Sequence, residues 1–226
     1  MSVDSKAASA IEAVVFDLDG VLIESEEDWE QARRDLVAGL TGGAWSRMDQ
    51  LSVLGTNMRQ CAELINLRHP TGLPDEEVGH RLIERRIHLY EERLKILPGA
   101  VDAVRASSAM LPIAIASSSP IEIINFVLDE LGVTECFSAI ASSDEVLHGK
   151  PEPDVYLLAC ERLDVAPPRA LAVEDSEPGI QSAWRAGMRV VALPNPSYRP
   201  SQASLALAVR QLASLGEFEN LLHSLT

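Results

Sequence analysis

Two aspartates, Asp17 and Asp19, directly follow the apolar run AVVF at residues 13–16. Residues two apart in an extended chain point to the same side, so we expect the two carboxylates to lie together. Carboxylates this close repel each other unless a proton or a cation separates them, and a hard cation such as Mg²⁺ is the simplest solution. Gly20 follows and permits a sharp turn that brings the backbone close to a ligand. Taken alone, the acid pair favours a turn cap at the end of a strand over a metal site.

Three further groups of polar residues follow apolar runs later in the chain. They are Ser117 in IASSS (115–119), Lys150 in GKPEPD (149–154), and Glu174 and Asp175 in AVEDS (172–176). In a parallel sheet covered by helices, ligands bind beyond the carboxyl ends of the strands, so these groups and the first acid pair are predicted to form one site. Other interpretations are a surface position for Lys150, and a role for Ser118 and Ser119 in capping a helix that begins near Pro120.

The elements that must position these residues are short strands alternating with helices. The predicted strands lack polar alternation, as is typical of strands covered on both faces, and lie at 13–16, 112–116, 138–142, 170–173 and 189–193. Helices are predicted at 100–109, 121–131, 153–163 and 177–186, with one or two short helices after the loop at 194–202. This alternation indicates the α/β class with a doubly wound parallel sheet. Between about 24 and 96 it is interrupted by helical patterns at 24–40, 57–68 and 75–95, which predict a helical insert directly after the first strand.

The composition sets broader bounds on function. The chain has 226 residues and a formal net charge of −15, with 46% hydrophobic and 23% charged residues, as in ordinary globular proteins. Its acidity argues against nucleic-acid and membrane partners but allows a small phosphorylated metabolite. The three isolated cysteines, Cys61, Cys136 and Cys160, indicate neither a zinc site nor a disulfide framework. The sequence contains no secretory signal and no apolar run of the ~20 residues that span a bilayer, so we expect a cytoplasmic protein, as a monomer or weak dimer.

The four motifs DLDGVLIES, IASSS, GKPEPD and VEDS, in this order, closely resemble those of the haloacid dehalogenase-like hydrolase superfamily. The helical insert resembles the type-1 cap of its β-phosphoglucomutase-like and sugar-phosphatase branch. The resemblance extends from about residue 11 to residue 195 and implies a Rossmann-like core formed by 1–22 and 97–226, with a cap at 23–96.

The resemblance also implies a role for each motif residue. Asp17 would be the nucleophile that forms an aspartyl-phosphate, and Asp19 would be the general acid and base. Lys150 would supply positive charge to Asp17 and to the phosphoryl group. The residues implied for phosphate binding are Ser117, Ser118, Lys150 and Gly20. Mg²⁺ would be the cofactor, and the residues implied for holding it are Asp17, Asp19 through its backbone carbonyl, Asp175, and Glu174 as a ligand or a supporting residue.

The same resemblance favours phosphate-ester chemistry. The position of Asp19 is not an acid in the dehalogenase and phosphonatase branches. The expected function is therefore a Mg²⁺-dependent phosphatase that acts on a small phosphorylated metabolite, namely a sugar or polyol phosphate. One alternative is a β-phosphoglucomutase-like phosphosugar mutase. A second alternative is a catalytically idle binding protein with this fold, against which the intact set of motif residues argues.

The cap is expected to set substrate specificity, because it closes over the site. The mutases of this branch carry a His where ESEEDW has Trp29, and an Arg where LGTNMRQCA has Met58, with Arg59 next to it. Both departures weaken the mutase alternative. The cap candidates for substrate contact are Trp29, Gly55, Thr56, Asn57 and Arg86. Trp29 is equally compatible with packing inside a cap helix, and Arg86 with solvated charge on an amphipathic helix.

Overall fold

Six strands form one parallel sheet in the order β3-β2-β1-β4-β5-β6. The structure is a computed structural model, and it describes residues 10–53, 56–195 and 199–226. The strands are β1 (Ala13–Phe16), β2 (Ile113–Ser117), β3 (Ala139–Ser142), β4 (Ala170–Glu174), β5 (Arg189–Ala192) and β6 (Arg210–Gln211). The first five coincide with the predicted strands, and the predicted α/β class with a parallel sheet is confirmed.

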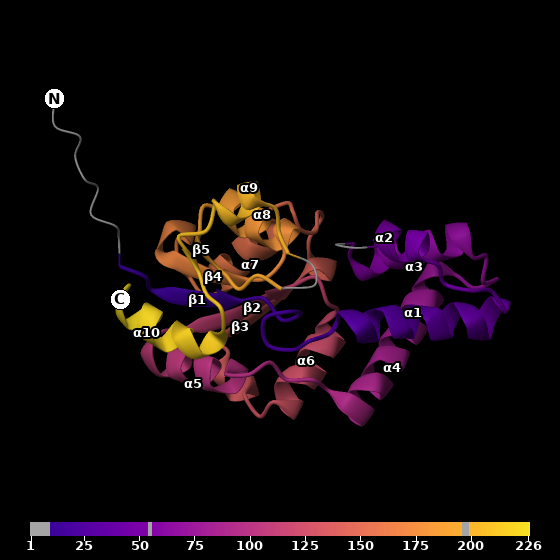
Figure 1. Cartoon of the computed structure of the whole chain (residues 1–226), viewed down its shortest axis with the longest axis horizontal. Coiled ribbons are helices and arrows are strands. Elements are labelled where there is room, and N and C mark those ends of the chain that lie inside the picture. Colours follow the sequence, from indigo (N-terminus) through magenta and orange to yellow (C-terminus); the bar gives the residue numbers. More distant parts are fainter. Residues whose placement is uncertain (1–9, 54–55, 196–198) are drawn as a thin grey trace.

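Helices cover both faces of this sheet, which explains why its strands are apolar throughout (Figure 1). One face packs against a cluster built with α5 (Ala100–Met110), α6 (Ile121–Glu130) and α10 (Phe218–His223). The other face packs against α7 (Asp154–Arg162) and α8 (Glu177–Arg185), with α9 (Gln202–Leu205) beside α8. The chain alternates between strand and helix here, so the carboxyl ends of β1, β2 and β4 lie at one edge of the sheet.

Four of the helices between β1 and β2 pack around an apolar cluster of their own, apart from α5. They are α1 (Glu26–Thr41), α2 (Arg47–Val53), α3 (Met58–Arg68) and α4 (Asp75–Arg93). Figure 1 shows this group beyond the edge of the sheet at which β1 ends. Within the group, α1 and α4 pack against each other. Three of these helices match the predicted patterns. The sequence analysis missed α2 because it has only seven residues, although Ser46 and Asp49 exchange the hydrogen bonds that mark its beginning.

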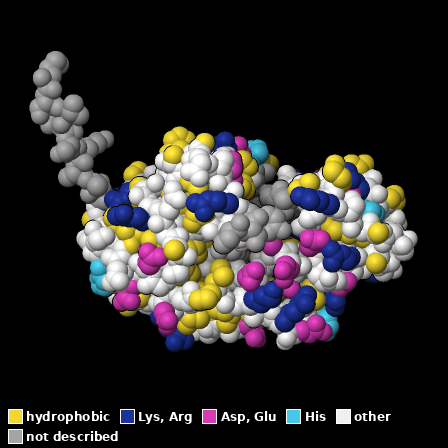
Figure 2. Space-filling view, in the orientation of Figure 1, with side chains coloured by type: hydrophobic (Ala, Val, Ile, Leu, Met, Phe, Trp, Pro, Cys, Tyr) yellow, Lys and Arg dark blue, Asp and Glu magenta, His cyan; other side chains and the backbone are white. Residues whose placement is uncertain are grey.

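The chain enters and leaves this helical group through two segments that pair with each other. Leu97 donates its backbone N–H to the carbonyl of Leu22 at 3.0 Å, and Glu24 donates to the carbonyl of Lys95 at 2.9 Å. Just beyond them, the Lys95 side chain lies 2.8 Å from Glu27. Figure 2 shows acidic and basic side chains interspersed on this face of the molecule. This pairing forms a narrow junction between the sheet and the helices. The domain boundaries at 22/23 and 96/97 remain a prediction.

The C-terminal part of the chain contains more than the short helices that the sequence predicted. α9 and α10 correspond to those helices, and β6 between them adds a sixth strand to the sheet. β6 has two residues, too few for a pattern to be visible in the sequence. Among the described residues, the structure contains no helix that is long and apolar enough to cross a membrane.

Candidate active site

The register of the sheet brings three of the four motifs together. Phe16, the last residue of β1, lies beside Ile115 of β2 and Val173 of β4. Asp17 follows and donates its backbone N–H to the carbonyl of Val173 at 3.0 Å. Because neighbouring parallel strands end at nearly the same level, Asp17, Ser117 and Glu174 meet at this edge, as predicted.

Lys150 connects all three of these strand ends. Its ammonium donates to Asp17 Oδ1 at 2.8 Å, to Glu174 Oε1 at 2.6 Å and to the carbonyl of Ala116 at 3.0 Å. The lysine is buried, which excludes the surface interpretation. Burial alone would lower the pKa of the ammonium, but the Asp17 and Glu174 carboxylates outweigh it and raise the pKa above its usual range. Lys150 is therefore a fixed positive charge at the strand ends.

Glu174 is held by hydrogen bonds on both of its carboxylate oxygens. Oε1 accepts from Lys150 and from the hydroxyl of Tyr156 at 2.7 Å. Oε2 accepts from the backbone N–H of Asp175 at 3.1 Å and from the hydroxyl of Ser176 at 3.1 Å. These bonds occupy the lone pairs that a metal would use, so they favour the supporting role over the ligand role for Glu174.

Two residues that the sequence analysis did not single out shape this part of the site. Tyr156 is completely buried on α7 and contacts Glu174. Gly179 lies so close that a Cβ atom at this position would come within 1.9 Å of Glu174 Oε1. The glycine in VEDSEPG was the available signal, because it marks a close approach of backbone to another group. Tyr156 reads as an ordinary apolar position of a helix and gave no such signal.

The carboxylates of Asp17, Glu174 and Asp175 form a cluster in which one oxygen of each lies within 4.8 Å of the others. Burial, with smaller contributions from Glu174 and Asp19, raises the pKa of Asp17 to about 8 against the opposing charge of Lys150. Burial and the charges of Glu174 and Asp17 raise the pKa of Asp175 well above its usual range. The Asp175 carboxylate accepts no hydrogen bond within the described part of the chain. A largely buried acid that lines the cavity beside a second acid fits the oxygen donor set of Mg²⁺.

The turn after the first motif brings the backbone against this acid cluster. Gly20 has a φ of 80°, a left-handed conformation that favours glycine. A Cβ atom here would come within 2.0 Å of Asp175 Oδ2. The sharp turn was predicted from the sequence together with a close approach to a ligand, whereas the group approached in the structure is the Asp175 side chain.

Asp19 is bound by both parts of the molecule. Ser119, which follows β2, donates its hydroxyl to Asp19 Oδ2 at 2.5 Å. Trp29 of α1 donates its indole N–H to Asp19 Oδ1 at 3.3 Å. The capping interpretation of Ser118 and Ser119 is wrong, because α6 begins after Pro120 and no side chain among the described residues caps it. Trp29 contacts the site as well as packing in the cap.

Arg86 is not a substrate contact, contrary to the sequence prediction, and it is not solvated either. Its side chain is 0% exposed and lies between the Trp29 and Tyr90 rings, with the guanidinium carbon 4.3 Å from each ring centroid. It donates to the carbonyl of Ser25 at 2.9 Å and lies 3.6 Å from Asp19 Oδ1. The burial arises because α4 packs along α1, which a one-dimensional helical pattern does not reveal.

A cavity of about 310 Å³ opens in front of these groups, between the strand ends and the helical group. This volume is at the lower end of the range of ~300–1,000 Å³ for small-molecule sites. Of the predicted residues, the cavity is lined by Asp17, Asp19, Ser117, Ser118, Lys150, Asp175, Trp29, Thr56 and Asn57. Gly55 lies outside the described residues. Lining residues that the sequence analysis missed include Glu26, Arg33, Asn195 and Arg199.

The residue at the position of the mutase arginine and its neighbour Arg59 also have clear locations. Met58, at the position of the mutase arginine, lines the cavity and is largely buried. Arg59 lines a separate groove between α3 and α4, and its side chain is 71% exposed beside Glu63. Arg59 therefore does not replace the missing arginine in the site.

Comparisons with known proteins agree with this geometry. A family model described as haloacid dehalogenase-like hydrolase matches residues 11–187. Hexitol phosphatase B of Escherichia coli (strain K12) is 36% identical over 208 residues, which cover 91% of this chain and 93% of the relative. Fructose-1-phosphate phosphatase YqaB of the same organism is 29% identical over 178 residues, covering 79% and 94%. The crystal structure of CbbY from Rhodobacter sphaeroides in complex with phosphate superimposes with a TM-score of 0.82 at 32% identity, covering 92% and 96%.

Proposed function

The chain belongs to the haloacid dehalogenase-like hydrolase family and is a phosphoric monoester hydrolase, and from this premise we propose that it is a Mg²⁺-dependent phosphatase of sugar or polyol monophosphates. The observation that carries the proposal is the buried contact of Lys150 with Asp17 and Glu174 at the mouth of a small cavity. The similarity to a hexitol phosphatase and to a fructose-1-phosphate phosphatase supports the substrate class.

Asp17 is the proposed nucleophile. Lys150 binds its Oδ1 atom, whereas Oδ2 accepts no hydrogen bond from the described residues and is free to attack. In the first step, Oδ2 forms a bond to phosphorus and the bond between phosphorus and the substrate oxygen breaks. The product of this step is an aspartyl-phosphate at Asp17 and the released alcohol.

Asp19 is the proposed general acid and base. It gives a proton to the oxygen of the leaving alcohol in the first step and takes a proton from the attacking water in the second. That water displaces Asp17 from phosphorus, which releases inorganic phosphate and restores both carboxyl groups to their initial states. The contacts of Asp19 with Ser119 and Trp29 support this role, because they hold a partly exposed carboxylate at the mouth of the cavity.

The phosphoryl group is proposed to lie between the ends of β1 and β2. Ser117 accepts a hydrogen bond from the backbone N–H of Ser119 at 3.0 Å, so its own hydroxyl proton is available to a phosphoryl oxygen. Ser118 lines the cavity beside it, and Lys150 supplies the positive charge. Asp17, Asp175 and the backbone carbonyl of Asp19 are the groups proposed to hold Mg²⁺. When bound there, the metal neutralises charge on the transferring phosphoryl group.

The test is a phosphate-release screen of the purified protein with Mg²⁺. The substrates are hexitol, hexose, glycerol, glycolate and nucleotide monophosphates. We expect release from hexitol or hexose monophosphates, no release after chelation by EDTA, and none from the Asp17→Asn protein. The proposal fails if Asp17→Asn keeps full activity. It also fails if the protein releases no phosphate but converts a sugar 1-phosphate to the 6-phosphate when a bisphosphate is added, as a mutase does.

A further inference from the structure

Arg33 of α1 occupies an unusual position at the helical side of the cavity. Its side chain is more than nine-tenths buried, yet it lines the cavity. Nη1 donates to Gln50 Oε1 at 3.3 Å, and the guanidinium carbon lies 5.3 Å from the centroid of the Trp29 ring. Nε has no hydrogen-bond partner, and no acid lies within ion-pair distance of Arg33 among the described residues. A buried cation with unused donors is costly unless something binds it.

The surroundings of Arg33 hold it in place. Gln50 Oε1 also accepts from the indole N–H of Trp45 at 3.1 Å, so the acceptor that binds Arg33 is itself fixed. The Trp29 ring lies beside the guanidinium groups of both Arg33 and Arg86. The guanidinium is therefore preorganised toward the cavity, which lowers the cost of binding a ligand group there.

Glu26 lines the same cavity and lies on the same face of α1 as Arg33. The positions 26, 29 and 33 are three and four residues apart, so their side chains lie on one side of α1. The Glu26 side chain forms no hydrogen bond or ion pair within the described part of the chain, so it too is available to a ligand. The helix α1 thus contributes one acceptor and one donor to the lining of the cavity.

Such a pair suits hydroxyl groups, which both donate and accept. A second phosphate group would gain from Arg33, but it would be repelled by Glu26 and by the acids of the catalytic site. We propose that Arg33 and Glu26 bind hydroxyls in the tail of the substrate and thereby select a polyol or sugar monophosphate, whose tail is uncharged, over a bisphosphate. This inference rests on the proposed phosphatase function and deepens it.

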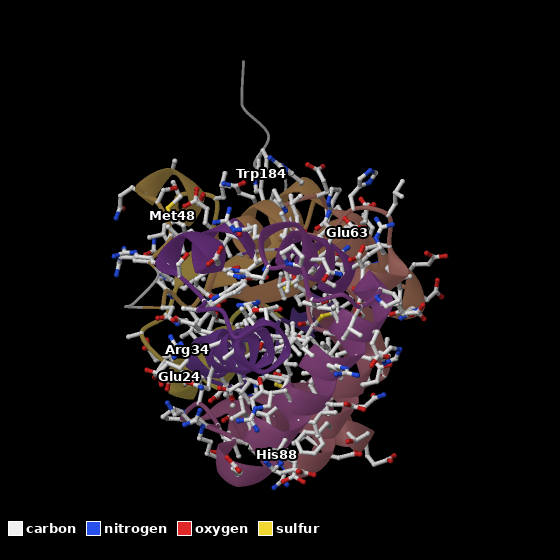
Figure 3. The ribbon with its side chains drawn as sticks, turned by 90° about the vertical axis from the view of Figure 1, so that its right-hand side faces the viewer. Glu24, Arg34, Met48, Glu63, His88 and Trp184 are labelled. Atoms are coloured by element: carbon white, nitrogen blue, oxygen red, sulfur yellow. The ribbon has the colours of Figure 1, made fainter. Side chains whose placement is uncertain are left out.

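The chain offers a matched control in Arg34. It is the next residue of α1, its side chain is 48% exposed, and it binds Glu30 at 2.5 Å on the outer side of the helix. Figure 3, which looks onto the helical group, labels Arg34. Arg33→Met and Arg34→Met remove the same charge at adjacent positions, and only the first faces the cavity.

The experiment compares kcat/KM for a hexitol 6-phosphate and for p-nitrophenyl phosphate, which lacks hydroxyls. We expect Arg33→Met to lower the value for the hexitol phosphate by ~10-fold to ~100-fold, as for loss of a hydrogen bond to a charged group. For p-nitrophenyl phosphate the change should stay below about 3-fold, because no hydroxyl contact is lost. Glu26→Gln should show the same selectivity, Arg33→Lys should retain part of the hexitol activity, and Arg34→Met should match the wild type.

Several results would overturn the inference. An equal loss on both substrates would make Arg33 a structural residue, and an unchanged hexitol activity would remove it from the site. A wild-type preference for hexose bisphosphates that disappears in Arg33→Met would identify an anion site instead. These outcomes leave the phosphatase function intact, whereas a wild-type protein that is inactive on every phosphate ester would overturn both proposals.

Discussion

The indole N–H of Trp29 donates a hydrogen bond to Asp19 Oδ1 at 3.3 Å. A helix of the cap thus contacts the carboxylate that we propose as the general acid. The other oxygen, Oδ2, accepts from Ser119 at the end of β2. Because the two oxygens are held by different parts of the chain, the orientation of the Asp19 carboxylate depends on how the cap lies against the sheet.

This relationship predicts a selective effect for Trp29→Phe, which removes the N–H and keeps an aromatic ring. We expect kcat/KM for a sugar phosphate to fall by about tenfold, because a poorly oriented acid protonates the leaving alcohol less efficiently. p-Nitrophenolate leaves without protonation, so kcat/KM for p-nitrophenyl phosphate should change much less. Trp184→Phe is the control, since Trp184 lies on α8 and is 52% exposed (Figure 3). Equal losses on the two substrates would contradict the orienting role.

A second prediction concerns Gly179, whose backbone lies against the Glu174 carboxylate. In Gly179→Ala, the added methyl would come within 1.9 Å of Glu174 Oε1 and displace the carboxylate that holds Lys150. We expect a loss of kcat of about 100-fold, as for other small misplacements of catalytic groups. The overpacking should lower the free energy of unfolding by about 1–3 kcal/mol.

Gly39→Ala is the matched control for this substitution. Gly39 lies in α1, and a Cβ atom there meets nothing within 4 Å. Activity assays and urea unfolding of the two variants, measured in parallel, check the prediction. Wild-type activity in Gly179→Ala would show that the Glu174–Lys150 contact is dispensable.

Removing the Asp175 carboxylate from the proposed metal site should change thermal stability in opposite directions with and without Mg²⁺. In the metal-free protein, Asp175→Asn should raise Tm, because burial and the neighbouring acids oppose ionisation of Asp175 and raise its pKa. With Mg²⁺ at about 100 times its Kd, the wild type should gain about 2.7 kcal/mol, which is roughly 5–10 °C in Tm. The Asp175→Asn protein should not be stabilised by Mg²⁺. Glu161→Gln, at an exposed position of α7, is the control. An identical Mg²⁺ shift in Asp175→Asn and the wild type would remove Asp175 from the metal site.

Asp49 gives a prediction for the pH dependence of stability. Burial opposes ionisation of its carboxylate, but hydrogen bonds from the Ser46 hydroxyl and backbone N–H and from Arg68 outweigh burial and hold its pKa below the usual range. The ionised form therefore stabilises the folded state above the unfolded pKa of about 3.9, and this contribution is lost as the pH falls below that value. Asp49→Asn should cost about 1–3 kcal/mol at pH 7. Urea unfolding at pH 7, 5 and 3 should show a constant difference from the wild type between pH 7 and 5 and a smaller one at pH 3. A constant difference at all three values would rule out this mechanism.

The fold and the positions of the catalytic motifs could be predicted from the sequence because their signals are local. Val14, Val15 and Phe16 form a run that is typical of a strand covered on both faces, and Asp17 follows at its end. Each motif ends a strand or lies in the loop beside one, and the carboxyl ends of parallel strands share one edge. The meeting of Asp17, Ser117 and Glu174 thus follows from the order of elements along the chain.

Only the tertiary structure decided which groups support or surround those motifs. Tyr156, Arg86 and Arg33 lie on helices whose patterns do not say what each side chain faces, and α2 and β6 are too short to show a pattern. Arg86 reaches Ser25 across 61 residues of sequence, and its burial depends on how α4 packs along α1. Periodicity identifies the face of a helix, whereas the partner of that face is set by packing between elements that are distant in the chain. For that reason the catalytic edge could be predicted from the chain alone, and the substrate side of the cavity, with Glu26 and Arg33, could not.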